Sequence, residues 1–152
     1  EICACLVGSE MCIRDSFTDL APLVEKRGIT LEADGDGVMT GSDALIYRLI
    51  FNLTENAVKY NRPGGSVRVC VTQETEKLMI RVSDTGCGIP EEYQQSIFQP
   101  FFRVDKSRSR EYGGAGLGLS LVWEIANLHG GSVWVEESSE KGTTIAVELP
   151  VQ

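Results

Sequence analysis

The sequence predicts an α+β fold, a two-layer sandwich in which helices cover one face of a mixed β-sheet. Segments with the apolar spacing of helices are interspersed with short β-favouring runs, and this mixture is the main observation behind the prediction. The chain has 152 residues, of which 42% are hydrophobic, so one domain with a real core is expected. The runs that predict strands are residues 29–31, 66–72, 77–83, 133–135 and 144–149.

The beginning of the chain fits no later part of this pattern. Residues 1–16 hold three of the five cysteines, and we expect a non-native or unstructured extension there, which leaves 17–152 as the domain. A short helix over 19–27 then precedes the first strand. The Asp-Gly-Asp-Gly sequence at 34–37 predicts a link before the next helix.

The strongest helix signal covers residues 44–60. Leu45, Leu49, Leu53 and Ala57 recur every four residues, which is the spacing of a helix that buries one face. The Ser-Asp pair directly before this segment supplies candidates for its N-cap. The sequence Asn-Arg-Pro-Gly-Gly follows at once and ends the helix.

A polar face of the same helix carries side chains suited to a magnesium–phosphate group. Asn52, Asn56 and Lys59 fall at i, i+4 and i+7, so they share one side of the helix. Asparagine oxygens are hard, neutral ligands for Mg2+, and a lysine supplies a positive charge for phosphate. A polar stripe that faces solvent would show the same spacing, so this helix alone leaves both interpretations open.

A second candidate site follows the hairpin that residues 66–72 and 77–83 are expected to form. Asp84 ends the second strand and begins the sequence Asp-Thr-Gly-Cys-Gly-Ile-Pro, in which Gly86 and Gly88 permit close approach of the backbone to a flat ligand. A carboxylate at a strand end can accept a hydrogen bond from the exocyclic amine of adenine, whereas guanine presents a carbonyl there. The alternative is an ordinary Asp-Thr-Gly turn.

A polar loop lies between the last two candidate elements. Residues 104–113 lack apolar periodicity and, together with Arg103, carry a cluster of basic side chains. Gly114, Gly116 and Gly118 follow and open a helix, whose free N–H groups would bind an anion. We therefore expect a lid over a phosphate tail, with a solvated charged loop as the alternative.

Four short motifs thus occur in order: NLTENAVKY at 52–60, DTGCGIP at 84–90, FQPFFR at 98–103 and GAGLGLS at 114–120. The ordered set resembles the N, G1, F and G2 boxes of the histidine-kinase ATP-binding domain, within the wider family that includes gyrase, the mismatch-repair ATPases and the large heat-shock chaperones. This resemblance implies the Bergerat-type form of the two-layer sandwich. A Walker A loop, a Rossmann fingerprint and the protein-kinase motifs do not fit the sequence.

The resemblance implies ATP as the substrate and Mg2+ as its metal. Asn56 and Asn52 would hold the metal, and Asp84 would bind adenine with help from Thr143, which matches the family's Gly-Thr after the last turn. The catalytic residues implied are Asn52, Lys59 and Arg103. The other implied nucleotide contacts are Tyr60, Gly86, Gly88, Ile89, Phe102, Gly114, Gly116, Leu117, Gly118 and Leu119.

One of these positions bears on the reaction. Asn52 stands where the ATP-hydrolysing members of the family carry a catalytic glutamate. Because an amide cannot accept a proton as a general base, simple ATP hydrolysis is disfavoured.

The resemblance also implies partners. A histidine kinase needs a phosphoacceptor, and the only histidine, His129, stands at a helix end before two glycines, which predicts a structural role. The acceptor histidine would lie on a separate dimerisation domain of the parent protein, with a response regulator downstream. The chain would bind Mg–ATP without phosphorylating itself. Two alternatives stay open: a serine kinase of the anti-sigma type, and a non-catalytic module that binds nucleotide or partners.

Composition narrows the setting further. A formal charge of −8 disfavours nonspecific contact with nucleic acid or an acidic membrane surface. No apolar stretch has the length of a membrane span, although the parent protein could still be anchored. Five cysteines without metal-ligand spacing indicate free thiols, so we expect a cytoplasmic domain.

Overall fold

The computed structural model describes residues 3–8, 12–100 and 118–151. The helices are α1 (Cys12–Arg27), α2 (Asp43–Lys59) and α4 (Gly118–Leu128), with single 3-10 turns η1 (Glu91–Tyr93) and η2 (Ser96–Phe98). The strands are β1 (Cys3–Gly8), β2 (Thr30–Asp34), β3 (Asp36–Gly41), β4 (Ser66–Gln73), β5 (Lys77–Asp84), β6 (Ser132–Ser139) and β7 (Gly142–Pro150).

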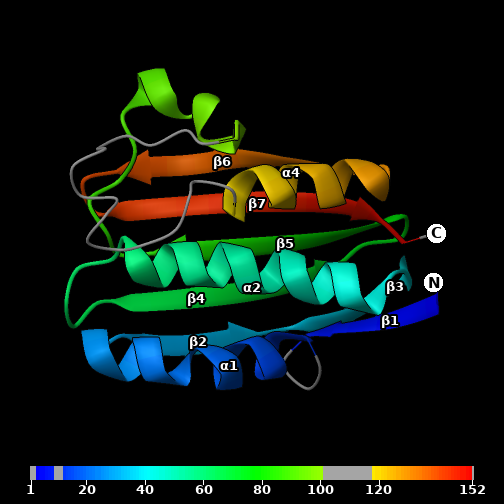
Figure 1. Cartoon of the computed structure of the whole chain (residues 1–152). Helices are drawn as coiled ribbons and strands as arrows, with labels where there is room; N and C mark the ends of the chain where they lie inside the picture. Colours follow the sequence, from blue (N-terminus) through cyan, green and yellow to red (C-terminus); the bar gives the residue numbers. More distant parts are fainter. Residues whose placement is uncertain (1–2, 9–11, 101–117, 152) are drawn as a thin grey trace.

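The main sheet has five strands in the order β2-β4-β5-β7-β6. The β2–β4 pair is parallel, and the other three pairs are antiparallel. Figure 1 shows α1, α2 and α4 side by side on one face of this sheet. The predicted α+β sandwich, with a mixed sheet and helices on one face, is confirmed.

Helix α2 is the centre of the helical layer, with α1 packed on one side and α4 on the other. Its apolar stripe is buried against the sheet, where Ile46, Leu49 and Ile50 have no exposed surface. Strand β4 alternates in the way that predicts a half-covered sheet, because Val67 and Val69 are buried while Arg68 between them is exposed. This core fixes the position of α2 relative to β4 and β5.

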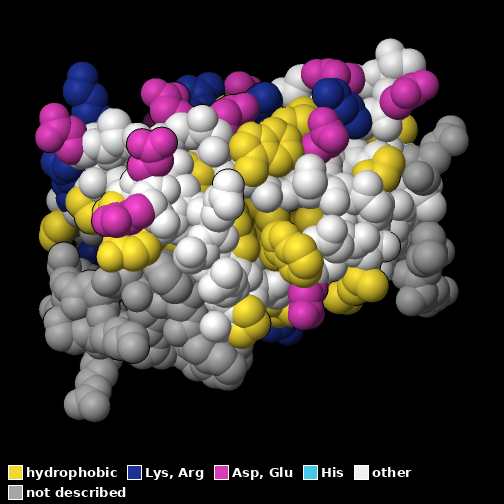
Figure 2. Space-filling model, turned by 90° about the horizontal axis from the view of Figure 1, so that it is seen from above, with side chains coloured by type: hydrophobic (Ala, Val, Ile, Leu, Met, Phe, Trp, Pro, Cys, Tyr) yellow, Lys and Arg dark blue, Asp and Glu magenta, His cyan; other side chains and the backbone are white. Residues whose placement is uncertain are grey.

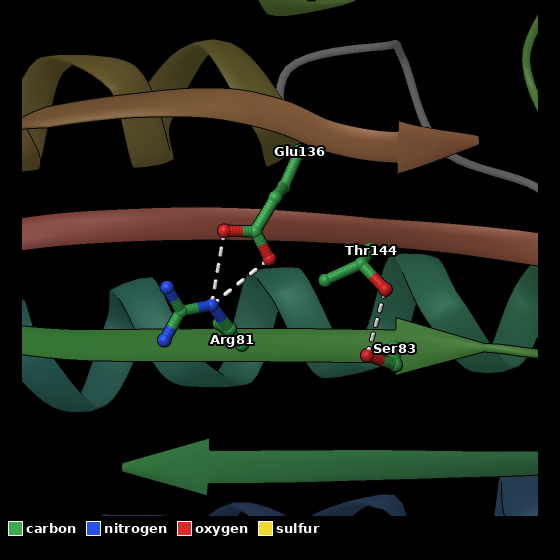
Figure 3. A network of polar contacts seen from close by, with 4 residues as sticks. All are labelled: Arg81, Ser83, Glu136 and Thr144. Atoms are coloured by element: carbon green, nitrogen blue, oxygen red, sulfur yellow. Dashed lines mark hydrogen bonds and ion pairs between the residues drawn. The ribbon is translucent and has the colours of Figure 1, made fainter. Parts of the chain in front are cut away.

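The opposite face of the sheet carries polar pairs instead of helices. Arg81 of β5 donates from Nε to both carboxylate oxygens of Glu136 on β6, at 3.1 and 2.9 Å. Beside this pair, the hydroxyl groups of Ser83 and Thr144 are hydrogen-bonded at 2.8 Å. Figure 3 shows both contacts in front of the strands, with α2 behind the sheet.

The start of the chain differs from the sequence-based expectation. Strand β1 pairs antiparallel with β3 along its whole length, and α1 begins at Cys12, with Ile13 fully buried. Residues 3–8 and 12–16 are therefore not unstructured: an unpaired β3 would leave backbone groups without partners, and β1 supplies them. A non-native origin of these residues stays a prediction, because pairing does not reveal where a sequence comes from.

The upper surface, over β6 and α4, exposes several apolar side chains. Trp123 and Leu128 of α4 are 48% and 74% exposed. Figure 2 shows apolar side chains on this side of the molecule among polar and charged ones. Within the described segments, no helix has both the length and the apolar character that crossing a membrane requires.

Candidate nucleotide-binding site

The C-terminal half of α2 presents the two predicted metal-binding carboxamides. The helix begins at its predicted N-cap, where the Ser42 hydroxyl accepts the N–H of Leu45 at 3.3 Å. Asn52 is only 8% exposed and Asn56 is half-buried, yet neither carboxamide bonds to another described side chain or backbone group. Neither carboxamide has a fully buried atom that lacks a partner, so both keep contact with solvent and are accessible to a ligand.

The end of the same helix carries the predicted phosphate-binding residues. Lys59 forms an ion pair with Glu55 one turn earlier, with Nζ and Oε1 3.7 Å apart. Tyr60, directly after the helix, is 46% exposed. Since the ion pair is partly exposed, it is weak and can be exchanged for a phosphate group.

The segment after β5 passes directly over this helix end. A Cβ atom on Gly86 would lie 2.7 Å from the carbonyl oxygen of Tyr60, so only glycine permits the crossing. The hydroxyl of Thr85 donates to Asn61 Oδ1 at 2.9 Å, and Asn61 Nδ2 donates to the Ser66 carbonyl at 2.8 Å. These contacts fix the first and second motifs against each other.

Asp84 ends β5 at this crossing. Its Oδ1 accepts two backbone N–H groups, from Gly86 at 2.9 Å and from Thr143 at 3.2 Å. Its Oδ2 has no partner among the described residues. Burial raises the pKa of Asp84, and the two backbone hydrogen bonds oppose that rise. The two backbone N–H groups thus fix the orientation of the carboxylate through Oδ1, and Oδ2 is available as an acceptor.

The turn between β6 and β7 closes the other side of Asp84. A side chain on Gly142 would overlap the Asp84 carbonyl, and one on Gly88 would overlap the Ser139 carbonyl. Gly88 also has φ +83°, which favours glycine. The hydroxyl of Ser138 accepts the Ile89 N–H at 2.7 Å and is bonded to the Thr143 hydroxyl at 2.8 Å. Three chain segments therefore meet around one carboxylate.

The structure brings many of the predicted site residues together at this end of the sheet. The residues that meet there are Tyr60, Asp84, Gly86, Gly88, Ile89 and Thr143. Asn56 and Lys59 lie in the last turn of α2 next to Tyr60, and Asn52 lies one turn earlier. Gly118 and Leu119 begin α4, which packs against α2. The predictions at Phe102, Arg103, Gly114, Gly116 and Leu117 lie outside the described residues.

Sequence reasoning missed three residues that organise the site: Asn61, Thr85 and Ser138. The first two could have been suspected, because they border the recognised motifs and have the side chains that stabilise turns. Ser138 had no such signal. Its neighbours Glu137 and Ser139 are polar as well, so nothing in the sequence indicates which of them faces the site.

Comparison with known proteins agrees with this geometry. Residues 41–152 match the family described as histidine kinase-, DNA gyrase B- and HSP90-like ATPase. The chain belongs to this family. It is 37% identical over 147 residues to the sensor histidine kinase RppB of Synechocystis sp., a match that covers 92% of this chain and 32% of RppB. The chain thus spans about a third of the length of this relative.

Solved structures of the family have the same architecture. The catalytic domain of the histidine kinase ThkA superposes with a TM-score of 0.84 at 26% identity, over 99% of this chain and 96% of that one. Full-length ShkA in complex with AMPPNP superposes with a TM-score of 0.83 at 25% identity, over 99% of this chain and 31% of that one. The chain is therefore an ATP-binding domain of the histidine-kinase type, similar to the catalytic domains of sensor histidine kinases.

Proposed function

We propose that this domain binds Mg–ATP and donates the γ-phosphoryl group to a histidine on a separate dimerisation domain of its parent protein, from which a response regulator then receives it. The observation that carries the proposal is the arrangement of Asp84. One of its oxygens is fixed by two backbone N–H groups, and the other is left as an acceptor at the end of β5, the central strand of the sheet.

The Asp84 carboxylate supports a preference for adenine. Adenine has an exocyclic amine, which can donate to Oδ2, whereas guanine has a carbonyl at the same position and would repel it. The oxygen needs no reorientation, because the backbone of Gly86 and Thr143 already holds the carboxyl group. The structural relative ShkA was solved in complex with AMPPNP, which supports an adenine nucleotide as the ligand.

The carboxamides of α2 fit a magnesium ion delivered with the phosphates. Asn56 and Asn52 offer neutral oxygens that no described group of the fold occupies. Mg2+ accepts one or two such protein ligands together with water and phosphate oxygens. The metal would neutralise charge on the phosphates, and Lys59 would add a positive charge after leaving Glu55.

The remaining chemistry in this proposal is positioning. Arg103 and residues 114–119 would hold the phosphate tail in line with an incoming histidine. Asn52 cannot act as a general base, so water would not be activated efficiently. His129 is a poor acceptor, since Nδ1 lies 2.8 Å from the Ile125 carbonyl and Nε2 accepts the Ser42 N–H at 3.2 Å. The acceptor must come from another domain.

Titration calorimetry with ATP, with and without Mg2+, tests the binding step. Asp84→Asn should weaken ATP binding by about tenfold to a hundredfold, because an acceptor opposite the amine becomes a donor. Asp34→Asn is the matched control, since Asp34 is an exposed strand-end carboxylate that pairs with Arg68 away from the site. Equal affinity of Asp84→Asn and the parent would contradict the adenine assignment.

A transfer assay tests the reaction. The chain is mixed with labelled ATP and either a helical hairpin that carries a histidine or a serine-bearing protein substrate. We expect label on the histidine only. Label on serine would support the anti-sigma type of kinase, and binding without any transfer would support a non-catalytic module.

A further inference from the structure

We propose that Ser138 is a positioning residue for nucleotide recognition. Its hydroxyl sets the direction of the hydrogen bond that the Thr143 hydroxyl donates to the base, and a bulge in β6 turns Ser138 toward the site. This inference rests on the proposed function and names a determinant of base specificity within that site.

The bulge is visible in the pairing of β6 with β7. Val135 is paired with Ile145, but the next pair joins Glu137 to Thr144, so Glu136 is an extra residue. Before the bulge, the odd-numbered Val133 and Val135 face the helices. After it, the even-numbered Ser138 is opposite Thr143, which is 5% exposed on that same face.

Regular alternation would have given the opposite result. With a period of two and no extra residue, Glu137 would face the site and Ser138 would face away from it. The bulge instead places Glu137 opposite Thr144 on the outer face, beside Glu136, which binds Arg81 there (Figure 3). An extra residue that re-aims a side chain next to a functional site is a recognised use of bulges.

The hydrogen bonds of Ser138 have a fixed direction. The N–H of Ile89 can only donate, so Ser138 Oγ must accept it, at 2.7 Å. The Ser138 hydrogen is then free to be donated, and within the described structure the acceptor in reach is the Thr143 hydroxyl, 2.8 Å away. The Thr143 hydrogen is consequently directed away from Ser138. Such chains of donors polarise one another and strengthen each bond.

The direction of this chain matches adenine chemistry. Next to its exocyclic amine, adenine has the ring nitrogen N1, which accepts a hydrogen bond. The backbone N–H of Thr143 is already used by Asp84 Oδ1, so the Thr143 hydroxyl is the group beside Asp84 that can donate to N1. Asp84 and Thr143 together would present an acceptor beside a donor, the complement of adenine. Guanine has these two properties reversed.

The test compares ATP with 1-deaza-ATP, in which a C–H group replaces N1, by calorimetry on the whole chain. The parent should bind ATP about tenfold or more tightly than the analogue, because one hydrogen bond to the base is lost and its donor is left unpaired. Ser138→Ala should reduce this ratio about three- to tenfold. Ser138→Thr keeps the hydroxyl and should retain the ratio.

Ser139→Ala is the matched control, because the Ser139 hydroxyl accepts the N–H of Lys141 in the turn and does not contact Ile89 or Thr143. An unchanged ratio in Ser138→Ala, with both affinities equal to or falling in parallel with those of the parent, would overturn the inference. A parent that does not distinguish the two nucleotides would also overturn it. A parent that binds neither nucleotide would reject the proposed function itself, and this inference with it.

Discussion

The two ends of α2 differ in whether their polar groups have hydrogen-bond partners. At the N-terminal end, the N–H of Ser42 donates to His129 Nε2 at 3.2 Å, and His129 Nδ1 lies 2.8 Å from the Ile125 carbonyl. Because a backbone N–H can only donate, the imidazole is neutral and carries its hydrogen on Nδ1. A Cβ on Gly41 would lie 2.7 Å from this ring, so the fit is close.

At the C-terminal end, several polar groups can still form hydrogen bonds with a ligand. Asp84 Oδ2 and the carboxamides of Asn52 and Asn56 have no partners among the described residues, although Asp84 and both asparagines are at least half-buried. One end of the helix is therefore arranged for stability and the other for a ligand. Substitutions at the first end should lower the free energy of unfolding, and those at the second should lower affinity.

The largest effect is expected at Asn56. Asn56→Ala should weaken ATP binding about tenfold to a hundredfold in Mg2+ and change it little in chelator, because the lost group is the proposed metal ligand. The free energy of unfolding should stay the same or rise by about 0.5 kcal/mol, since alanine is a better helix former. Calorimetry and urea unfolding measure the two quantities. A clear loss of stability would mean that Asn56 is a structural residue.

His129→Ala should show the reverse pattern. The substitution leaves the Ser42 N–H without its partner and removes the side-chain contact to the Ile125 carbonyl, which still accepts the backbone N–H of residue 129. It should lower the free energy of unfolding by about 1–3 kcal/mol. ATP affinity of the folded protein should remain that of the parent. Asn127→Ala is a suitable control, because Asn127 makes only an exposed bond to the Trp123 carbonyl on the same helix. If both variants had the same free energy of unfolding, the His129 contacts would not stabilise the fold, and the proposed difference between the two ends would be wrong.

The pH dependence of Asp84 gives a further contrast. Its folded pKa is raised, chiefly by burial, so the folded state binds the proton more tightly than the unfolded state. Its contribution to stability therefore falls as pH rises from the unfolded pKa through the folded one. Affinity for ATP should change the opposite way and fall on acidification, because the carboxylate is the acceptor. Both trends should be absent from Asp84→Asn, in unfolding and binding experiments over pH 3–7.

The smallest effect is expected at Tyr47 in the first half of α2. Its hydroxyl donates to Asp19 of α1, and partial burial, this bond and nearby carboxylates raise the pKa of Tyr47 to about 12. Because the bond is exposed, Tyr47→Phe should lower the free energy of unfolding by at most about 1 kcal/mol, without altering ATP affinity. A change in affinity would show that α1 influences the site.

Much of the fold followed from local sequence patterns. The four-residue spacing predicted a helix over 44–60, and the structure has it at Asp43–Lys59. Alternation and the intervening turn predicted the hairpin, which forms from β4 and β5 with Asp84 at the strand end. Helix α4 and strands β6 and β7 also lie where apolar runs predicted them.

Other features depended on partners far away in the chain. Residues 34–37 look like a linker, yet Asp34 ends β2, which pairs with β4, and residues 36 and 37 begin β3, which pairs with β1. His129 acquires its role from Ser42, 87 positions earlier. Neither contact can be predicted from the residues next to either partner in the sequence.

By itself, the sequence determined which helix and which strand carry the candidate nucleotide-binding side chains, because helical and strand periods decide locally which residues share a face. Only the tertiary structure decided which groups are already satisfied and which remain for a ligand. Hydrogen-bond partners such as Ser138 and Thr143 are set by the register between strands, and one extra residue in β6 reverses the face that follows it.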